Sequence, residues 1–213
     1  MKKIFLIIII LSSLQVKAQE VKNSFLNMPD SITPLLTPVN KADMIDFLES
    51  NMKAQVQNRF SGVSEMTHLT PNFIRIQMSE KSFMEIKLLP VTDSLSIVGI
   101  ITTACAPVCD SYIKFYSPEW ESLSVSDFID LPDREQFFHT SDFSEKDHFQ
   151  DVRLKAEMFL VKAEFSPLEN QLTFTLTTPE DMSPEDAEKL LPFINSPIEY
   201  VWEGQRFIPK TSF

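Results

Sequence analysis

The chain has 213 residues, a formal net charge of −11 and a hydrophobic content of 43% with 18 phenylalanines, which is typical of a packed globular protein. This acidic balance repels phosphate backbones, and no basic stripe offsets it, so nucleic-acid binding is not expected. Only 3 glycines occur, which excludes the glycine-rich loops of dinucleotide-binding and P-loop proteins.

The first eighteen residues have the features of a cleavable secretory signal peptide. Lys2 and Lys3 form a positive region, and residues 4–14 are almost entirely apolar. This apolar run is well short of the ~20 residues that a membrane-spanning helix needs. We therefore expect cleavage after Ala18 and a mature chain, residues 19–213, with a charge of about −14 and no membrane span. An uncleaved membrane anchor is the alternative.

The positions of the cysteines indicate whether the exported chain could carry a lipid anchor. Neither cysteine lies at the expected cleavage point, so a lipid anchor of the bacterial lipoprotein kind has no attachment residue. The sequence thus predicts a periplasmic or secreted protein that is not a lipoprotein.

The first half of the mature chain opens with a proline-rich stretch, residues 23–38, which predicts an extended lead-in. A helix is expected next, with Asn40 as its N-cap and apolar residues at helical spacing over residues 44–52. Strict alternation of apolar and polar residues then predicts a hairpin over residues 74–78 and 84–88.

Two more strands are expected over residues 95–103 and 112–116, joined by the loop that holds both cysteines. The following stretch, residues 124–153, is polar and acidic with no clear period, and it is the expected connection between two halves. Each half is expected to hold one helix and about four strands. That similarity hints at duplication, although no residue-level repeat supports it.

The second half shows the same mixture of patterns. Strands are expected over residues 159–165 and 172–176, and a last hairpin over residues 198–209. Between them, Ser183 as N-cap and Pro184 at the first helical position predict a helix. The whole pattern predicts an α+β fold, mainly antiparallel sheet with about two main helices, in one compact domain whose lobes would meet within the connection.

Cys105 and Cys109 are the sharpest local feature. Two cysteines four residues apart at a hairpin tip, in an oxidising exported compartment, predict a small disulfide loop. Two free thiols are the alternative. A redox or copper role is disfavoured, because Cys109 leads into a strand pattern and no histidine lies near in sequence.

His139 and His148 lie among carboxylates in the polar connection and are the candidate metal ligands. Their spacing matches no standard zinc motif, so we expect a solvated acidic loop and no metal or cofactor. No Gly-x-Ser-x-Gly nucleophile elbow occurs, and His68 is the remaining histidine available as a general base. No catalytic residue is therefore predicted.

Trp120 and Trp202 each follow an aromatic-rich strand. If exposed, they would form a binding platform for a sugar or a peptide. Burial in the core is the favoured alternative, since tryptophan is usually well buried.

Three segments carry a resemblance to a known family: Lys-Leu-Leu-Pro at 87–90, Ile-Ile-Thr-Thr at 100–103, and Asp-Ser-Tyr-Ile-Lys-Phe-Tyr at 110–116, followed by Trp120. They resemble an exported Bacteroidetes family known only as domain of unknown function family 3256. The similarity covers most of the mature chain, from Phe25 onward. It implies an envelope or secreted location in a Gram-negative anaerobe, and it transfers no catalytic residue.

Without a catalytic constellation, the sequence favours a non-catalytic exported binding module of the bacterial envelope. Its partner would be an unknown protein, peptide or glycan, held at a sheet face or an edge strand. The alternative is a hydrolase of envelope or dietary polymers whose acid and base lie far apart in sequence. A structural role within a larger envelope complex is the third hypothesis.

Overall fold

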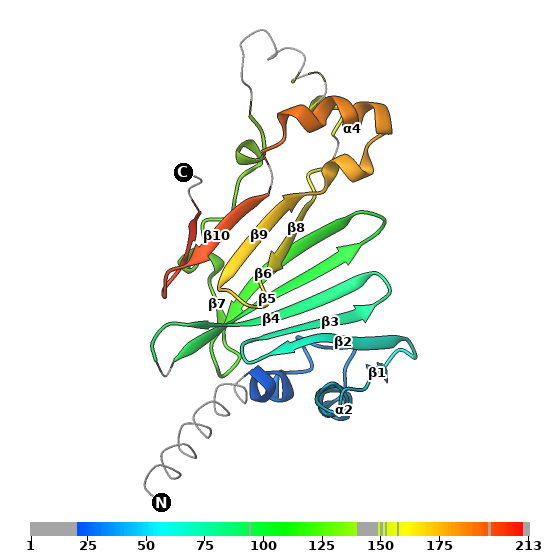
Figure 1. Cartoon of the computed structure of the whole chain (residues 1–213), viewed down its shortest axis with the longest axis vertical. Coiled ribbons are helices and arrows are strands. Elements are labelled where there is room, and N and C mark those ends of the chain that lie inside the picture. The colour runs from blue at the N-terminus through cyan, green and yellow to red at the C-terminus, as the bar shows by residue number, and fades with distance from the viewer. Residues whose placement is uncertain are drawn as a thin grey trace, which may run out of the picture.

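A computed structural model describes residues 21–93, 95–139, 149, 151, 153–156, 158–195 and 197–210. The expected signal peptide, residues 1–18, lies outside the described residues. The described chain contains two antiparallel sheets, of seven and four strands. Figure 1 shows the seven-stranded sheet below the four-stranded one, with helices at both ends of the molecule. The fold is α+β and mainly antiparallel sheet, as the sequence predicts.

The larger sheet is a meander in which every strand pairs with the next one along the chain. Its strands are β1 (Ala54–Gln57), β2 (Val63–Thr70), β3 (Phe73–Ser79), β4 (Ser82–Pro90), β5 (Ser96–Cys105), β6 (Cys109–Tyr116) and β7 (Ser122–Leu123). The last strand is much shorter than its neighbour β6, so most of that edge of the sheet is left uncovered by β7.

The smaller sheet is also a meander, with β8 at one edge and β11 at the other. Its strands are β8 (Val161–Phe165), β9 (Gln171–Leu176), β10 (Ile198–Trp202) and β11 (Phe207–Pro209). The helices are a segment over residues 21–27, α2 (Pro38–Glu49) and α4 (Pro184–Leu190), with short 3₁₀ turns η1 (Val125–Asp127), η2 (Arg134–Phe137), η4 (Thr178–Asp181) and η5 (Leu191–Phe193).

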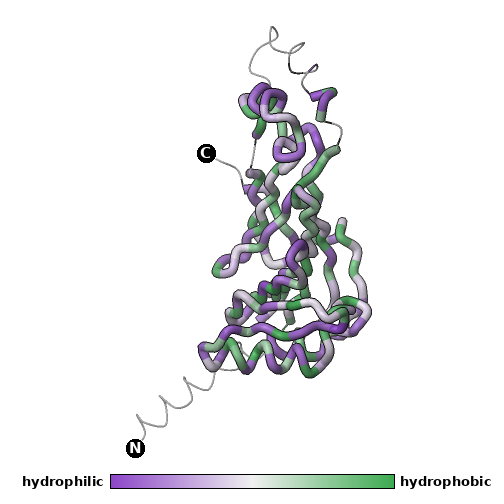
Figure 2. The backbone as a smooth tube through the Cα atoms, turned by 90° about the vertical axis from the view of Figure 1, so that its right-hand side faces the viewer, coloured by the Kyte–Doolittle hydropathy of each residue, from purple (hydrophilic) through white to green (hydrophobic). Residues whose placement is uncertain are grey.

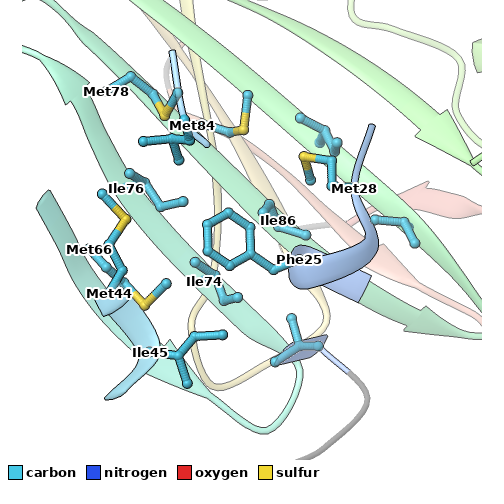
Figure 3. Close-up of a cluster of buried hydrophobic side chains, with 14 of the residues drawn as sticks. Phe25, Met28, Met44, Ile45, Met66, Ile74, Ile76, Met78, Met84 and Ile86 are labelled. Carbon is cyan, nitrogen blue, oxygen red and sulfur yellow. The ribbon is translucent and has the colours of Figure 1, made fainter. Parts of the chain in front are cut away.

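One face of the larger sheet is covered by the segment 21–27 and α2. Alternate side chains of β3 and β4, such as Ile76 and Ile86, point to this face because successive residues of a strand face opposite sides. They pack against Phe25 and Met44 from the two helices, as Figure 3 shows. The apolar side chains of this layer, rich in methionine, form the first core.

The opposite face of the larger sheet packs against the smaller sheet. Leu89, Ile101 and Phe115 contribute from the larger sheet, and Phe165 and Phe174 contribute from the smaller one. Strand β8 crosses the larger sheet from β6 to β4, so the two sheets form a second core without merging. The side view in Figure 2 shows hydrophobic and hydrophilic residues alternating along the strands of both sheets.

No helix in the described part of the chain is both long and apolar enough to cross a membrane.

Several local predictions differ from the structure. Residues 21–27 are helical, so the segment expected to be an extended lead-in begins with a helix. Helix α2 begins earlier than expected: Thr37 is the N-cap, Pro38 takes the first turn, and Asn40 is the third residue of a capping box with Thr37. The expectation of about four strands is confirmed for the second half, which has four, and is wrong for the first half, which has seven. Helix α4 begins after Ser183, as predicted.

Candidate functional site

A groove of about 290 Å³ lies where β6 and β8 approach each other, and it is termed the edge groove. Its lining residues are Asp110, Ser111, Tyr112, Ile113, Leu131, Pro132, Phe159, Val161, Ala163 and Phe174. Most of these side chains are apolar, and a single carboxylate lies among them. Such a groove provides hydrophobic contact with only a few polar groups to orient a ligand.

The main chain of β6 is paired on one side only at the groove. The Ala106 N–H donates to the Val108 carbonyl, so these two residues are a hydrogen-bonded pair at the end of the β5–β6 ladder. Because hydrogen-bonded pairs occur at every second residue of an antiparallel ladder, the main-chain groups of the even-numbered residues of β6 bond to β5. The main-chain groups of the odd-numbered residues face the opposite edge of β6, where pairing with β7 begins only at Phe115. The N–H and C=O groups of Ser111 and Ile113 therefore point along this open edge without a main-chain partner in the described part of the chain.

The open edge exists because the chain turns away after β7. Leu123 pairs with Phe115, and a longer β7 would next have covered Ile113. Instead the chain enters the 3₁₀ turn η1 and then passes Leu131 and Pro132, which line the groove. Leu131 is 51% exposed, so this wall of the groove has solvent on its outer side.

Strand β8 presents a second open edge at the same place. The Ser166 N–H donates to the Gln171 carbonyl, so the main-chain groups of the even-numbered residues of β8 bond to β9. Those of Val161, Ala163 and Phe165 therefore face away from β9. Side chains of the larger sheet accept from two of these N–H groups: Asp110 Oδ1 from Val161 at 3.0 Å and Glu85 Oε2 from Phe165 at 2.7 Å.

Another side-chain hydrogen bond joins β6 to the end of β9. The Thr177 hydroxyl, just after β9, donates at 2.7 Å to the carbonyl of Cys109. Carboxylates and hydroxyls thus complete the strand edges where main-chain pairing stops, which is one way that proteins protect exposed edges. The Ala163 N–H, which lies between the two capped positions, has no such bond among the described residues.

Beside the groove, charged side chains fasten the β8–β9 hairpin to the larger sheet. The Arg75 Nε donates at 2.7 Å to Glu85, and the same guanidinium lies 3.2 Å from Glu164. Lys87, fully buried, donates at 2.9 Å to the Ser166 carbonyl. These residues, Arg75, Glu85, Lys87, Glu164 and Ser166, are termed the charged junction.

Burial shifts two pKa values in the charged junction. It raises the pKa of Glu85 above the usual range, although the neighbouring Arg75 guanidinium acts in the opposite direction. It lowers the pKa of Lys87 to about 8, which the Glu85 carboxylate partly counteracts. Both groups have partners that join the sheets, so these shifts follow from a structural role and do not indicate a catalytic centre.

Cys105 and Cys109 form a disulfide across the end of the β5–β6 hairpin. It lies next to Asp110, and therefore at one end of the edge groove. The bond closes the turn from which the open edge of β6 starts.

The two tryptophans do not form a common platform. Trp202 is 6% exposed and its Nε1 donates at 2.7 Å to the Pro90 carbonyl, so the ring belongs to the second core. Trp120 is half-buried against Tyr116, with ring centroids 5.7 Å apart, and packs on the first core. The tryptophans therefore lie in different layers of the molecule.

His68 and His139, the two histidines in the described part of the chain, lie in different segments. His139 is exposed, and its main-chain N–H donates at 2.8 Å to the Phe193 carbonyl. His148 lies outside the described residues. His68 packs edge-on against Phe73. In the described ranges, no group of three or more His, Cys, Asp or Glu side chains has the arrangement of a metal site.

Sequence reasoning did not find the edge groove. Its decisive groups are main-chain N–H and C=O groups, which every residue carries, and its walls come from four separate segments. The only available signal was the short interval between the β6 pattern and the polar connection that follows it.

The described chain is thus an α+β protein of two stacked antiparallel meanders, with an apolar groove between strand edges and no described metal centre. The chain belongs to the family described as "Protein of unknown function (DUF3256)", whose model matches residues 13–207. A solved structure of a domain of an uncharacterized protein from Porphyromonas gingivalis W83 is 27% identical, with a TM-score of 0.78. The match covers 90% of this chain and 99% of that one. No curated protein matches.

Proposed function

We propose that this protein is a non-catalytic interaction module of the bacterial envelope that holds its partner in the edge groove. One observation carries the proposal: an apolar groove lies directly beside two residues, Ser111 and Ile113, whose main-chain groups are unpaired among the described residues. Open strand edges attract other strands, and proteins either protect them or use them for recognition. Here Val161 and Phe165 of β8 are capped by side chains, whereas the main-chain groups of Ser111 and Ile113 in β6 have no such cap among the described residues.

The charged residues at the edge groove support binding over hydrolysis at this site. Hydrolysis of a glycoside requires two carboxylates placed on either side of the scissile bond. Among the described residues, the lining of the edge groove contains one carboxylate, Asp110, and no histidine. Glu85 and Glu164, the nearby acids of the charged junction, are paired with Arg75.

An exported location is part of this proposal. It is supported by the signal-peptide features of residues 1–18 and by the disulfide, since disulfides persist in oxidising compartments. Fractionation of a native host, with mass measurement of the intact protein, tests it. We expect a chain beginning at Gln19 in the periplasmic or extracellular fraction. A chain that retains residues 1–18 in the cytoplasm would contradict this location.

Site-specific photo-crosslinking tests the binding site. A photoreactive amino acid at Leu131, in the groove wall, should capture a partner in the native host. The same amino acid at Leu168, which is 86% exposed and lies outside the edge groove, is the matched control. Equal capture at both positions would contradict a specific groove. Turnover of a polysaccharide or peptide substrate by the purified protein would favour the hydrolase instead.

A further inference from the structure

Resting on the proposed function, we infer that the partner is an extended peptide segment that joins the larger sheet as a strand beside β6. It carries small or medium apolar side chains at two alternate positions and a basic residue next to Asp110. The inference names the chemistry of the partner, which the proposal of a binding module leaves open.

The main-chain groups of the open edge fit a peptide strand. Ser111 and Ile113 each present one N–H donor and one C=O acceptor, two residues apart, which is the repeat of an antiparallel ladder. A strand that continues the direction of β7 would bond to all four groups. A glycan has hydroxyls but no such alternating ladder of donors and acceptors, so the edge selects a polypeptide.

The walls of the groove define the side chains of the peptide. Residues directly opposite each other in a ladder place their side chains on the same face of the sheet. The two peptide residues opposite Ser111 and Ile113 therefore point toward the second core, where Ala163 and Phe174 line the groove. Because the volume is only about 290 Å³, two branched aliphatic side chains suit the groove better than two aromatic ones.

Charge determines the residue at the Cys109 end. Asp110 is exposed at the mouth of the groove, and one of its carboxylate oxygens accepts from the Val161 N–H. The whole chain carries a net charge of −11, which attracts a cationic segment. In an antiparallel strand this basic residue follows the second apolar residue.

A free segment fits the groove better than a second copy of the domain. Leu131 and Pro132 form one wall, and Phe159 and Val161 form another. A strand embedded in a second sheet would bring its neighbouring strand against these walls, whereas a single extended segment enters between them. The test must therefore distinguish self-association through β6 from binding of a free peptide segment.

Titration of the mature protein with defined peptides tests this inference. The probe is Ac-Thr-Val-Thr-Val-Lys-Thr-NH₂, followed by ¹H–¹⁵N spectra and hydrogen exchange. We expect the amide signals of Ser111 and Ile113 to shift and their exchange to slow. The amide of Tyr112, which already bonds to β5, is the internal control and should stay protected throughout.

Three altered peptides separate the contributions. N-methylation of both valines removes two donors and should weaken binding at least about tenfold, since each hydrogen bond contributes about 1 kcal/mol. Placing the valines next to each other should also weaken binding, because only one would then face the groove. Replacing lysine by glutamate should weaken binding several-fold at low salt and less at high salt.

Protein variants complete the test. Leu131→Glu should abolish binding, and Leu168→Glu should leave it unchanged. If Leu131 captures a partner in the host but no extended peptide binds, the strand inference fails while the proposed function stands. Binding that is insensitive to N-methylation, preferential binding of oligosaccharides, or concentration-dependent dimers that protect Ser111 and Ile113 would each overturn the inference.

Discussion

The carboxylate of Glu85, in β4, accepts a hydrogen bond of 2.7 Å from the main-chain N–H of Phe165, in β8, 80 residues further along the chain. This bond closes the edge of β8 with a side chain from the other sheet. Arg75 neutralises the same carboxylate, which is almost fully buried. The two sheets are therefore joined by a charged contact as well as by the apolar side chains of the second core.

Removing this carboxylate should weaken the contact between the sheets and measurably lower the free energy of unfolding. We expect Glu85→Ala to lower the free energy of unfolding by about 2–3 kcal/mol, because it leaves the buried Phe165 N–H without its acceptor and the Arg75 guanidinium with Glu164 as its remaining carboxylate partner. Glu85→Gln should cost less, since its amide oxygen still accepts from Phe165. Urea unfolding of both variants measures the difference. Equal losses would show that the charge, and not the acceptor, is what the junction needs.

Gly99 gives a second, independent test of how the sheets pack. A Cβ at this position would lie 2.8 Å from Cζ of Phe165 and 3.4 Å from Phe115. Because the interface is closely packed, we expect Gly99→Ala to cost about 1–3 kcal/mol of unfolding free energy. Thermal and urea unfolding check the value.

A double-mutant cycle identifies the cause of that cost. Phe165→Leu removes the ring atom that the new Cβ would meet, so Gly99→Ala should be tolerated better in the Phe165→Leu background than in the wild type. Strictly additive losses would mean that the ring is not the obstacle and that the backbone of β5 itself resists the change.

The part of the fold that was predictable from the sequence is the part governed by local patterning. The β3–β4 hairpin follows from strict alternation, because one face of both strands is buried against helices. Helix α4 follows from its cap, since the Ser183 side chain accepts from the Asp186 N–H. Both signals lie within a few residues of the structure that they specify.

Where the sequence pattern was ambiguous or interrupted, the prediction was wrong or no prediction was made. Thr37 and Asn40 belong to one capping box, so the sequence allows either residue as the N-cap of α2. In the structure Thr37 is the N-cap. Strand β2 has a bulge between Met66 and His68 that interrupts its alternation. The edge groove depends on which main-chain groups remain unpaired, and that is decided by the end of β7 and not by any residue type.

The buried Lys87 predicts a specific dependence of stability on pH. An unfolded lysine keeps its proton up to about pH 10.4, whereas the pKa of Lys87 is lowered to about 8. Between these values the unfolded chain binds more protons, so this group adds stability as pH rises. That contribution is fully present above about pH 10.4 and is lost as pH falls to about 8.

Comparison with Lys87→Met isolates this effect, because other titrating groups cancel between the two proteins. We expect the unfolding free energy of the wild type, minus that of the variant, to increase from pH 8 to pH 10. The Ser166 carbonyl and Asn72 lose a donor in the variant at every pH. A pH-independent difference, measured by urea unfolding in matched buffers, would mean that Lys87 stays charged when folded.

The disulfide is expected to matter more for the groove than for global stability. A loop closed between Cys105 and Cys109 is short, so its loss should lower the unfolding free energy by less than about 2 kcal/mol. The Cys109 carbonyl and the Asp110 carboxylate, however, hold Thr177 and Val161 across the sheet junction. Replacing both cysteines by serine should therefore weaken capture at the groove while the protein stays folded.

Thiol labelling of the exported protein checks the bond directly. Treatment with an alkylating agent before reduction should leave the mass unchanged, and treatment after reduction should modify both cysteines. If both react without reductant, the loop is open in the native protein and the double serine variant should bind as the wild type does. If the bond is present but the variant binds equally well, the β5–β6 turn keeps its shape through the ladder between β5 and β6 alone, and the bond is dispensable for the groove.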